Sequence, residues 1–304
     1  MGLTVQTEIQ TRVTKQQENN MKLVRFGAAG KEKPGIVDAQ GAIRDLSAHV
    51  KDISGETLAP ASIDKLRKID PASLPLAPAG ARIGAPVGDV RNFIAVGLNY
   101  ADHAKEAGMP IPKEPILFNK LANCIIGPND DIMMPKGTGK LDWELEIAFV
   151  VNRRARYVSE ADAPGYIAGY TICNDVSARD WQIERSGGQW MKGKCMENSG
   201  PLGPWLVTPD EVGDPQNLDM FLDVSGTRMQ KGNTKTMIFG CHFLMHYITQ
   251  FMMLEAGDVV TTGTPPGVAL GQKPTPTFLK VGDVMHLNIQ KLGEQKSKIV
   301  EFKL

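Results

Sequence analysis

Residues 142–151 read Asp-Trp-Glu-Leu-Glu-Ile-Ala-Phe-Val-Val, and the interpretation of the chain starts from this stretch. Alternation along a strand would place Asp142, Glu144 and Glu146 on one face. Three carboxylates on one face repel one another, so positive charge is needed close by. The spacing fits either an edge strand with a solvated acidic face or a site for a hard divalent cation such as Mg²⁺, Mn²⁺ or Ca²⁺.

Length and composition are those of a globular protein. The chain has 304 residues, of which 42% are apolar and 22% charged, and 34 Lys plus Arg balance 34 Asp plus Glu. We therefore expect no nucleic-acid partner and no membrane partner. There is no membrane-length apolar run and no signal-peptide pattern, which favours a cytoplasmic protein. The cysteines form no CxxC pair and are expected as free thiols: Cys124, Cys173, Cys195 and Cys241.

The chain divides into three parts. Residues 1–20 are rich in Gln, Asn, Thr and Lys, which is typical of a disordered extension or a remnant of cloning. Residues 21–89 are expected to form a small β-rich N-terminal domain and a linker, with a short helix near Ile63 and Leu66. Residues 90–304 are expected to form the larger body.

Short strands dominate the expected structure of the body. They are predicted at 92–97, 116–118, 131–134, 169–173, 259–262, 284–289 and 297–302. A short helix is predicted at 100–107 and a long apolar helix at 236–254, and Ser177 is a candidate cap for a helix through Asp180 and Trp181. Many strands, few helices and no regular strand–helix alternation predict an α+β or mainly β fold.

Several polar residues are candidates for chemistry. Asp175 follows a buried strand and is a possible third ligand beside Glu144 and Glu146; the alternative is a turn or a helix cap. His103 and Glu106 are three residues apart, so they share a helix face and could activate water; the alternative is a solvated surface helix.

Other histidines and donors are more ambiguous. His242 and His246 are four residues apart, but residue 243 is Phe, so we interpret them as core or interface histidines. Beside a metal, three donors after Asp175 could contact a carboxylate or an oxyanion: Arg179, Gln182 and Lys194. The loop at 263–267 could hold an anion through Thr264, or be a plain turn.

Taken together, these segments resemble the fumarylacetoacetate hydrolase family over about residues 90–300. The matching blocks are GLNYADHAKE (97–106), DWELE (142–146), NDVSARDWQ (174–182), GPLGPW (200–205) and GDVVTTGTPPGV (257–268). The resemblance implies a mixed β-sandwich roll, behind a small N-terminal domain, that forms a homodimer or higher homo-oligomer.

The resemblance also implies roles for individual residues. Glu144, Glu146 and Asp175 would bind Mg²⁺ or Mn²⁺, and His103 with Glu106 would form the water-activating pair on a lid. The remaining roles are a contact of Lys194 with the substrate carbonyl and substrate binding by Arg179, Gln182, Lys120 and Thr264. The chain departs from many relatives after Lys194, at 195–199, and after Lys120, at 121–122.

The implied activity is metal-dependent hydrolysis of a carbon–carbon bond in a 2,4-diketo acid, giving pyruvate and a carboxylic acid. The layout resembles members acting on 2,4-diketo-3-deoxy-L-rhamnonate or -fuconate, with lactate as product, which are often labelled ureidoglycolate lyase. The alternatives on the same scaffold are ureidoglycolate lyase, oxaloacetate decarboxylase and hydroxymuconate-type isomerase or decarboxylase. The alternative from another class is a non-catalytic metal- or anion-binding protein.

Overall fold

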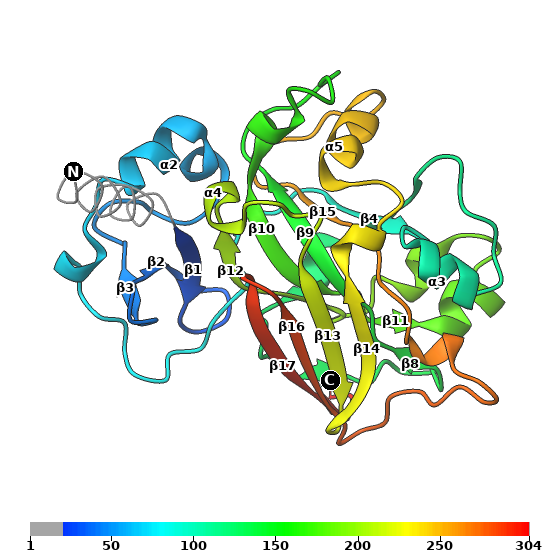
Figure 1. Ribbon diagram of the computed structural model, residues 1–304. Coiled ribbons are helices and arrows are strands. Elements are labelled where there is room, and N and C mark those ends of the chain that lie inside the picture. The colour runs from blue at the N-terminus through cyan, green and yellow to red at the C-terminus, as the bar shows by residue number, and fades with distance from the viewer. Residues whose placement is uncertain (1–20, 304) are drawn as a thin grey trace, which may run out of the picture.

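Most strands belong to one large mixed sheet. The computed structural model describes residues 21–303, so the expected extension at 1–20 lies outside the described residues (Figure 1). Across the large sheet the strands are ordered β3 (Ile43–Asp45), β2 (Lys33–Val37), β1 (Lys22–Phe26), β12 (Gly200–Val207), β10 (Ile167–Asn174), β9 (Leu145–Val151), β15 (Val259–Thr261), β4 (Phe93–Gly97) and β5 (Ile116–Lys120), and β6 (Ile125–Ile126) also pairs with β12. The α+β, mainly β class predicted from the sequence is confirmed.

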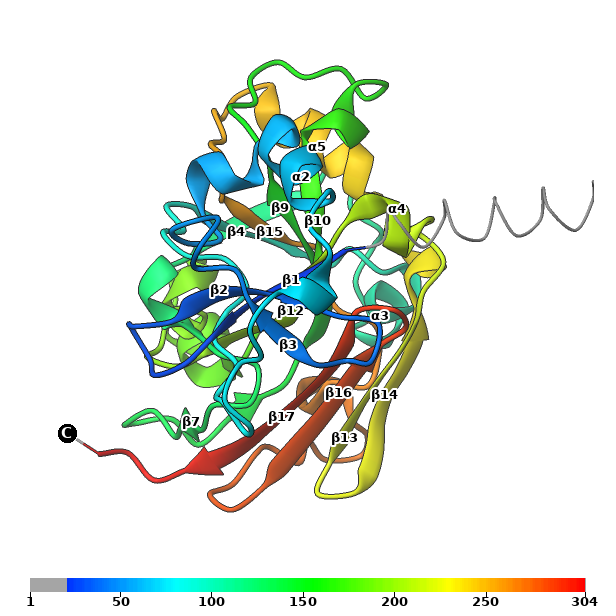
Figure 2. The same ribbon diagram turned by 90° about the vertical axis from the view of Figure 1, so that its left-hand side faces the viewer.

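A second sheet packs against the large one. Its strands are ordered β14 (Thr227–Asn233), β13 (Asp219–Val224), β16 (Val284–Ile289), β17 (Gly293–Val300) and β7 (Ile132–Met133). Figure 2, seen from the side of β1–β3, shows β13, β14, β16 and β17 packed beside the large sheet. A small sheet pairs β8 (Leu141–Asp142) with β11 (Ser177–Ala178) near the carboxyl end of β10.

Strand β9 lies between β10 and β15 and is buried on both faces. Leu145, Ile147 and Phe149 pack into the core shared with the second sheet. Ala148 and Val150 pack into another core on the opposite face, together with the N-terminal strands and α2. Because both faces are covered, the run after Glu146 has no polar alternation. The edge-strand interpretation of the acidic stretch was therefore wrong.

The acidic stretch is not one continuous strand as predicted. It breaks at Trp143 and Glu144, between β8 and β9. The Asp142 carboxylate turns away and accepts hydrogen bonds from the amides of Ala269 (2.8 Å) and Leu270 (3.0 Å). These backbone donors stabilise a buried carboxylate, which the simple alternation of a strand does not take into account.

The helices are few and short. They are α2 (Pro60–Leu66), α3 (Ala101–Glu106), α4 (Pro209–Val212), α5 (Cys241–Thr249) and the π-helix η5 (Asp180–Glu184). Single 3-10 turns cover Gly55–Leu58, Pro71–Ser73, Ala122–Cys124, Ala163–Tyr166, Trp190–Gly193, Thr234–Thr236 and Ala269–Gly271. None of the helices in residues 21–303 has the length and apolar character needed to cross a membrane.

Two helix predictions were wrong in detail. The helix expected at 236–254 begins only after Gly240, whose backbone is extended, and ends at Thr249. The Thr249 hydroxyl donates to the carbonyl of Met245, and the Gln250 side chain donates to that of His246, which satisfies the last turn. Ser177 is no helix cap, because it lies in β11 and donates to the carbonyl of Asp175.

The N-terminal strands continue the large sheet. Leu23 of β1 lies opposite Leu206 of β12 in an antiparallel pair. Figure 1 places β1–β3 on one side of the molecule and α3 on the other. The predicted domain boundary near residue 90 stays a prediction, and all four cysteines are free thiols as expected.

We expect Phe149→Ala to lower the free energy of unfolding by about 3–5 kcal/mol, because it empties a fully buried site in the central strand. The matched control is Phe251→Ala, since Phe251 is 57% exposed; its cost should stay below about 1 kcal/mol. Urea unfolding measures both values. Equal losses would contradict the position of β9 at the centre of the core.

Candidate active site

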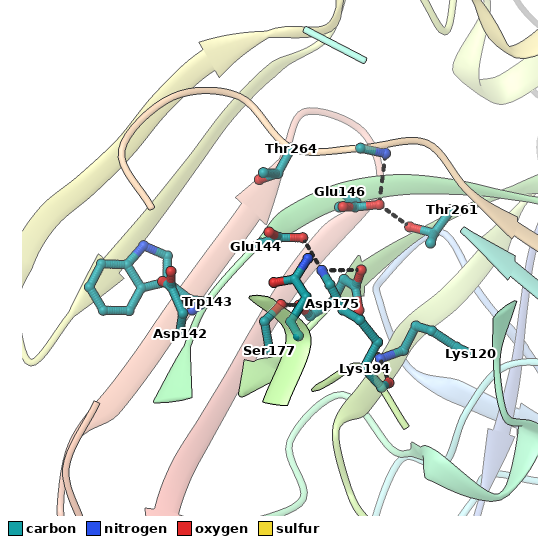
Figure 3. Close-up of polar contacts among 12 residues, drawn as sticks. Lys120, Asp142, Trp143, Glu144, Glu146, Asp175, Ser177, Lys194, Thr261 and Thr264 are labelled. Atoms are coloured by element: carbon teal, nitrogen blue, oxygen red, sulfur yellow. Dashed lines mark hydrogen bonds and ion pairs between the residues drawn. The ribbon is translucent and has the colours of Figure 1, made fainter. Parts of the chain in front are cut away.

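Three buried carboxylates meet where β9 begins and β10 ends. Oxygens of Glu144, Glu146 and Asp175 all lie within 4.8 Å of one another. The pairing of the two strands, which sets Leu145 opposite Asn174, brings them together. The Asn174 side chain also accepts a hydrogen bond from the amide of Glu144 (3.1 Å). Figure 3 shows the three carboxylates, which we call the carboxylate cluster, facing a common point.

Glu146 is positioned by hydrogen bonds from the end of β15 and from the loop that follows it. Its Oε2 accepts hydrogen bonds from the Thr261 hydroxyl (2.5 Å) and the Gly263 amide (2.8 Å). Burial, and after it the negative charges of Asp175 and Glu144, raise the pKa of Glu146 well above its usual value. Glu146 therefore loses its proton readily only when additional positive charge reaches the cluster.

Three basic side chains surround the carboxylate cluster. Lys194 Nζ lies between Glu144 Oε2 (2.6 Å) and Asp175 Oδ2 (2.7 Å). Lys120 Nζ lies 2.8 Å from Asp175 Oδ1, and Arg179 Nη2 lies 2.7 Å from Glu144 Oε1. Burial alone would raise the pKa of Glu144, but the charges of Lys194 and Arg179 outweigh it and lower the value.

The cluster fits a hard divalent cation. It offers carboxylate oxygens from three residues, the donor type that Mg²⁺, Mn²⁺ and Ca²⁺ prefer. The raised pKa of Glu146 also indicates a cation site, because an added cation would stabilise the ionised form of this carboxyl group. Glu144, Glu146 and Asp175 are therefore the residues that would hold the ion.

A cavity of about 240 Å³ opens over the cluster. Most of the side chains predicted to form the site line this cavity: His103, Glu106, Glu144, Glu146, Arg179, Gln182, Lys194 and Thr264. Asp175 and Lys120 lie beneath it. Lys120 is buried and also donates to the carbonyls of Lys194 (2.6 Å) and Ser199 (3.2 Å). In this geometry Lys120 supports Asp175, and the predicted contact between Lys120 and substrate stays a prediction.

His103 and Glu106 face each other on α3 at the cavity wall. The distance from His103 Nδ1 to Glu106 Oε2 is 3.0 Å, and Glu106 Oε1 accepts a hydrogen bond from the amide of Gly267 (3.0 Å). Gly271 packs against the same carboxylate, since a Cβ there would lie 2.6 Å from Glu106 Cδ. The carboxylate is thus positioned from two sides and in turn orients the imidazole.

Hydrogen bonds to other protein groups hold three further side chains of the cavity wall, those of Arg179, Gln182 and Thr264. Arg179 donates from Nη1 to Gln182 Oε1 (2.8 Å) and from Nε to Asp142 Oδ2 (2.8 Å). The Thr264 hydroxyl donates to the carbonyl of Leu145 (2.9 Å) and accepts from the Gln230 side chain. Their predicted contacts with substrate stay predictions. Neither His242, beside Tyr170, nor His246, bonded to the carbonyl of Val158, lines the cavity.

Sequence reasoning missed two groups of residues. The first supports the cluster, and its members are Thr261, Gly263 and Asn174; the 257–268 block carried a signal for the first two, but it did not indicate Glu146 as their partner. The second is the apolar part of the lining, which includes Met109, Phe118, Ile183, Trp190 and Leu270. No periodicity or spacing connects these five in the sequence.

Comparison with known proteins identifies relatives along nearly the whole chain. The family model described as fumarylacetoacetate (FAA) hydrolase C-terminal matches residues 92–300. A Burkholderia lata protein named "Putative hydrolase" is 58% identical over 275 residues, which are 90% of this chain and 97% of that protein. A Burkholderia ambifaria protein of the same name has the same identity and coverage.

Solved structures resemble this one in fold. A fumarylacetoacetate hydrolase from Exiguobacterium antarcticum has a TM-score of 0.80 at 34% identity, covering 93% of this chain and 100% of its own. A structure titled 5-carboxymethyl-2-hydroxymuconate delta-isomerase, from Mycobacterium smegmatis, has a TM-score of 0.73 at 30% identity, with the same coverage.

We expect Asp175→Asn to weaken the binding of Mg²⁺ or Mn²⁺ at least tenfold, because losing a ligand should cost no less than losing an outer partner, about 10- to 100-fold. The matched control is Asp180→Asn, whose carboxylate accepts from Thr138 and Gly139 and does not belong to the cluster. Titration calorimetry measures both. Equal affinities would mean that the ion binds elsewhere.

Proposed function

This chain belongs to the fumarylacetoacetate hydrolase family, and we propose that it hydrolyses the carbon–carbon bond of a 2,4-diketo acid to pyruvate and a carboxylic acid. One observation carries the proposal: the His103–Glu106 pair lines the same cavity as Glu144 and Glu146 of the carboxylate cluster. The pair can activate water, and the cluster can hold a metal that binds an α-keto acid.

The proposed cofactor is Mg²⁺ or Mn²⁺, held by Glu144, Glu146 and Asp175. When bound, such an ion would supply Lewis acidity toward the 1-carboxylate and 2-oxo oxygens of the substrate. Lys194 lines the cavity beside these ligands and would donate to the same oxygens, where negative charge develops. Arg179, which is hydrogen-bonded to Gln182, would orient the acid from the side.

His103 would act as the general base. Its Nδ1 donates to Glu106, so Nε2 is the atom that accepts a proton from water. The resulting hydroxide adds to the C4 carbonyl, and the C3–C4 bond then breaks. The bonding electron pair goes to C3 as the enolate of pyruvate, and a proton returned to C3 completes pyruvate. The C4 fragment leaves as a carboxylic acid.

Within this class, the sequence resemblance points to 2,4-diketo-3-deoxy-L-rhamnonate or -fuconate, with lactate as the second product. A second candidate is isomerisation, because the Mycobacterium smegmatis neighbour is titled an isomerase. Isomerisation of a hydroxymuconate-type acid needs no activated water, so the His103–Glu106 pair favours hydrolysis. On a panel of diketo acids, coupled detection of pyruvate with and without a chelator distinguishes the two reactions, because hydrolysis releases pyruvate and isomerisation does not. Pyruvate from oxaloacetate would instead indicate decarboxylation, and loss of ureidoglycolate without pyruvate would indicate the lyase reaction.

We expect His103→Ala to lower kcat for pyruvate release by about 100- to 10,000-fold, the usual contribution of a general base. Binding of Mg²⁺ should stay within twofold of that of the unchanged protein, because His103 is not part of the carboxylate cluster. Stopped assays and titration calorimetry provide the two readouts. Full turnover in this variant would exclude the His–Glu mechanism.

Gly271→Ala tests the positioning of Glu106. The added Cβ would push the carboxylate away from His103, so kcat should fall about tenfold with little change in KM or thermal stability. The control is Gly139→Ala, where a Cβ meets no atom within 4 Å and the backbone is not left-handed. Unchanged kcat in Gly271→Ala would show that Glu106 does not need this position.

A further inference from the structure

The inner wall of the cavity is aromatic. Phe118 on β5 and Trp190, in the turn Trp190–Gly193, meet edge to face with ring centroids 5.7 Å apart. The Phe118 ring also lies 5.2 Å from Lys194 Nζ, which contacts the carboxylate cluster. The aromatic surface therefore begins directly beside the point where the diketo acid head would bind.

Trp190 is a fixed part of this wall. A Cβ built on Gly97 of β4 would lie 2.2 Å from Trp190 Cζ3, so the indole lies against bare backbone. Close contact of this kind leaves the ring little freedom to rotate. The wall presents a flat apolar surface to whatever enters the cavity.

The rim of the cavity is also apolar. Met109, Ile183 and Leu270 lie in three separate segments, line the same cavity, and are 47%, 52% and 40% exposed. Exposed apolar side chains that gather around one opening indicate a binding surface. A ligand that covers them would remove their apolar area from water.

Most polar side chains of the lining are bonded to other polar side chains. The Arg179 and Gln182 side chains are bonded to each other, and Lys194 contacts Glu144 and Asp175. The lining also contains His103 and Glu106, which are bonded to each other, and Lys273, which is exposed. A hydroxyl group placed against the aromatic wall would lose water and meet few partners, which costs affinity.

We propose that this cavity selects 2,4-diketo acids whose acyl group is a hydrocarbon, held by an acyl subsite made of Phe118, Trp190, Met109, Ile183 and Leu270. The inference rests on the proposed function and narrows its substrate class. It predicts a higher kcat/KM for hydrocarbon acyl groups than for the acyl group of the deoxy-sugar acids, to which the sequence resemblance points and in which C5 carries a hydroxyl.

The first test compares two substrates of the same shape. In 5-methyl-2,4-dioxohexanoate a methyl group replaces the hydroxyl of 5-hydroxy-2,4-dioxohexanoate, which has the constitution of 2,4-diketo-3-deoxy-L-rhamnonate and -fuconate. We expect kcat/KM for pyruvate release to favour the methyl compound by about tenfold or more, since a methyl-for-hydroxyl exchange in an apolar site is worth up to about 100-fold. Equal values, or preference for the hydroxyl compound, would overturn the acyl subsite. They would leave diketo acid hydrolysis itself intact.

The second test needs no turnover, so it separates the subsite from the proposed reaction. With Mg²⁺ present, titration calorimetry would measure the binding of 2-oxobutanoate, 2-oxohexanoate and 2-oxooctanoate, which lack the 4-carbonyl and are not cleaved. Each added methylene should tighten Kd by about fourfold until the chain leaves the cavity. Affinity that does not depend on chain length, including no binding of any of the three acids, overturns the inference even if pyruvate is released from other substrates.

Variants at the rim assign the effect to the subsite. Leu270→Ala and Ile183→Ala should each weaken the binding of 2-oxooctanoate by about three- to tenfold, and reduce the gain from 2-oxobutanoate to 2-oxooctanoate. Both positions are partly exposed, so folding should be preserved. The matched control is Leu76→Ala, because Leu76 is 62% exposed and does not line the cavity. Equal effects in all three variants would count against the acyl subsite.

Discussion

The structure depends on a balance of charge in a place with almost no water. Glu144, Glu146 and Asp175 are buried together, and such a group is tolerated only when cations lie within contact distance. Lys194, Lys120 and Arg179 supply three positive charges, and each contacts at least one of the carboxylates. A divalent ion bound by the cluster would compete with Lys194 for the oxygens of Glu144 and Asp175 between which that ammonium lies. The position of Lys194 would then depend on whether such an ion is bound.

Strand register supplies the precision that this balance needs. β9 and β10 pair along their length, and the cluster forms where β9 begins and β10 ends. The Thr261 hydroxyl at the end of β15 and the Gly263 amide in the loop after it donate to Glu146. Asp142 fixes Arg179 and the backbone of Ala269. A two-layer scaffold thus positions the groups near the carboxylate cluster, while α3 brings the histidine from a separate segment. This division suits a site that must hold one end of its substrate firmly.

The sequence revealed the fold class through local signals, whereas the convergence of the carboxylates followed from the family resemblance, because a turn or a helix cap stayed open for Asp175. Short apolar strands mark the sheets, and Asp175 directly follows one of them. It could not reveal that Asp142 turns toward two amides, because those amides lie 127 and 128 residues further along. The position of Lys120 under Asp175 depends on a similar long-range contact. The apolar lining was invisible for the same reason: Met109, Phe118 and Leu270 share no periodicity and meet only in three dimensions.

The hydrogen bonding of β1 to β12 has a consequence for the whole fold. β12 neighbours β10, which leads directly into Asp175, and β1 covers the other side of β12. Without β1, the amides and carbonyls on that side would be left as an open template for strands of other molecules. The N-terminal strands thus cover a side of β12 that strands of other molecules could otherwise pair with.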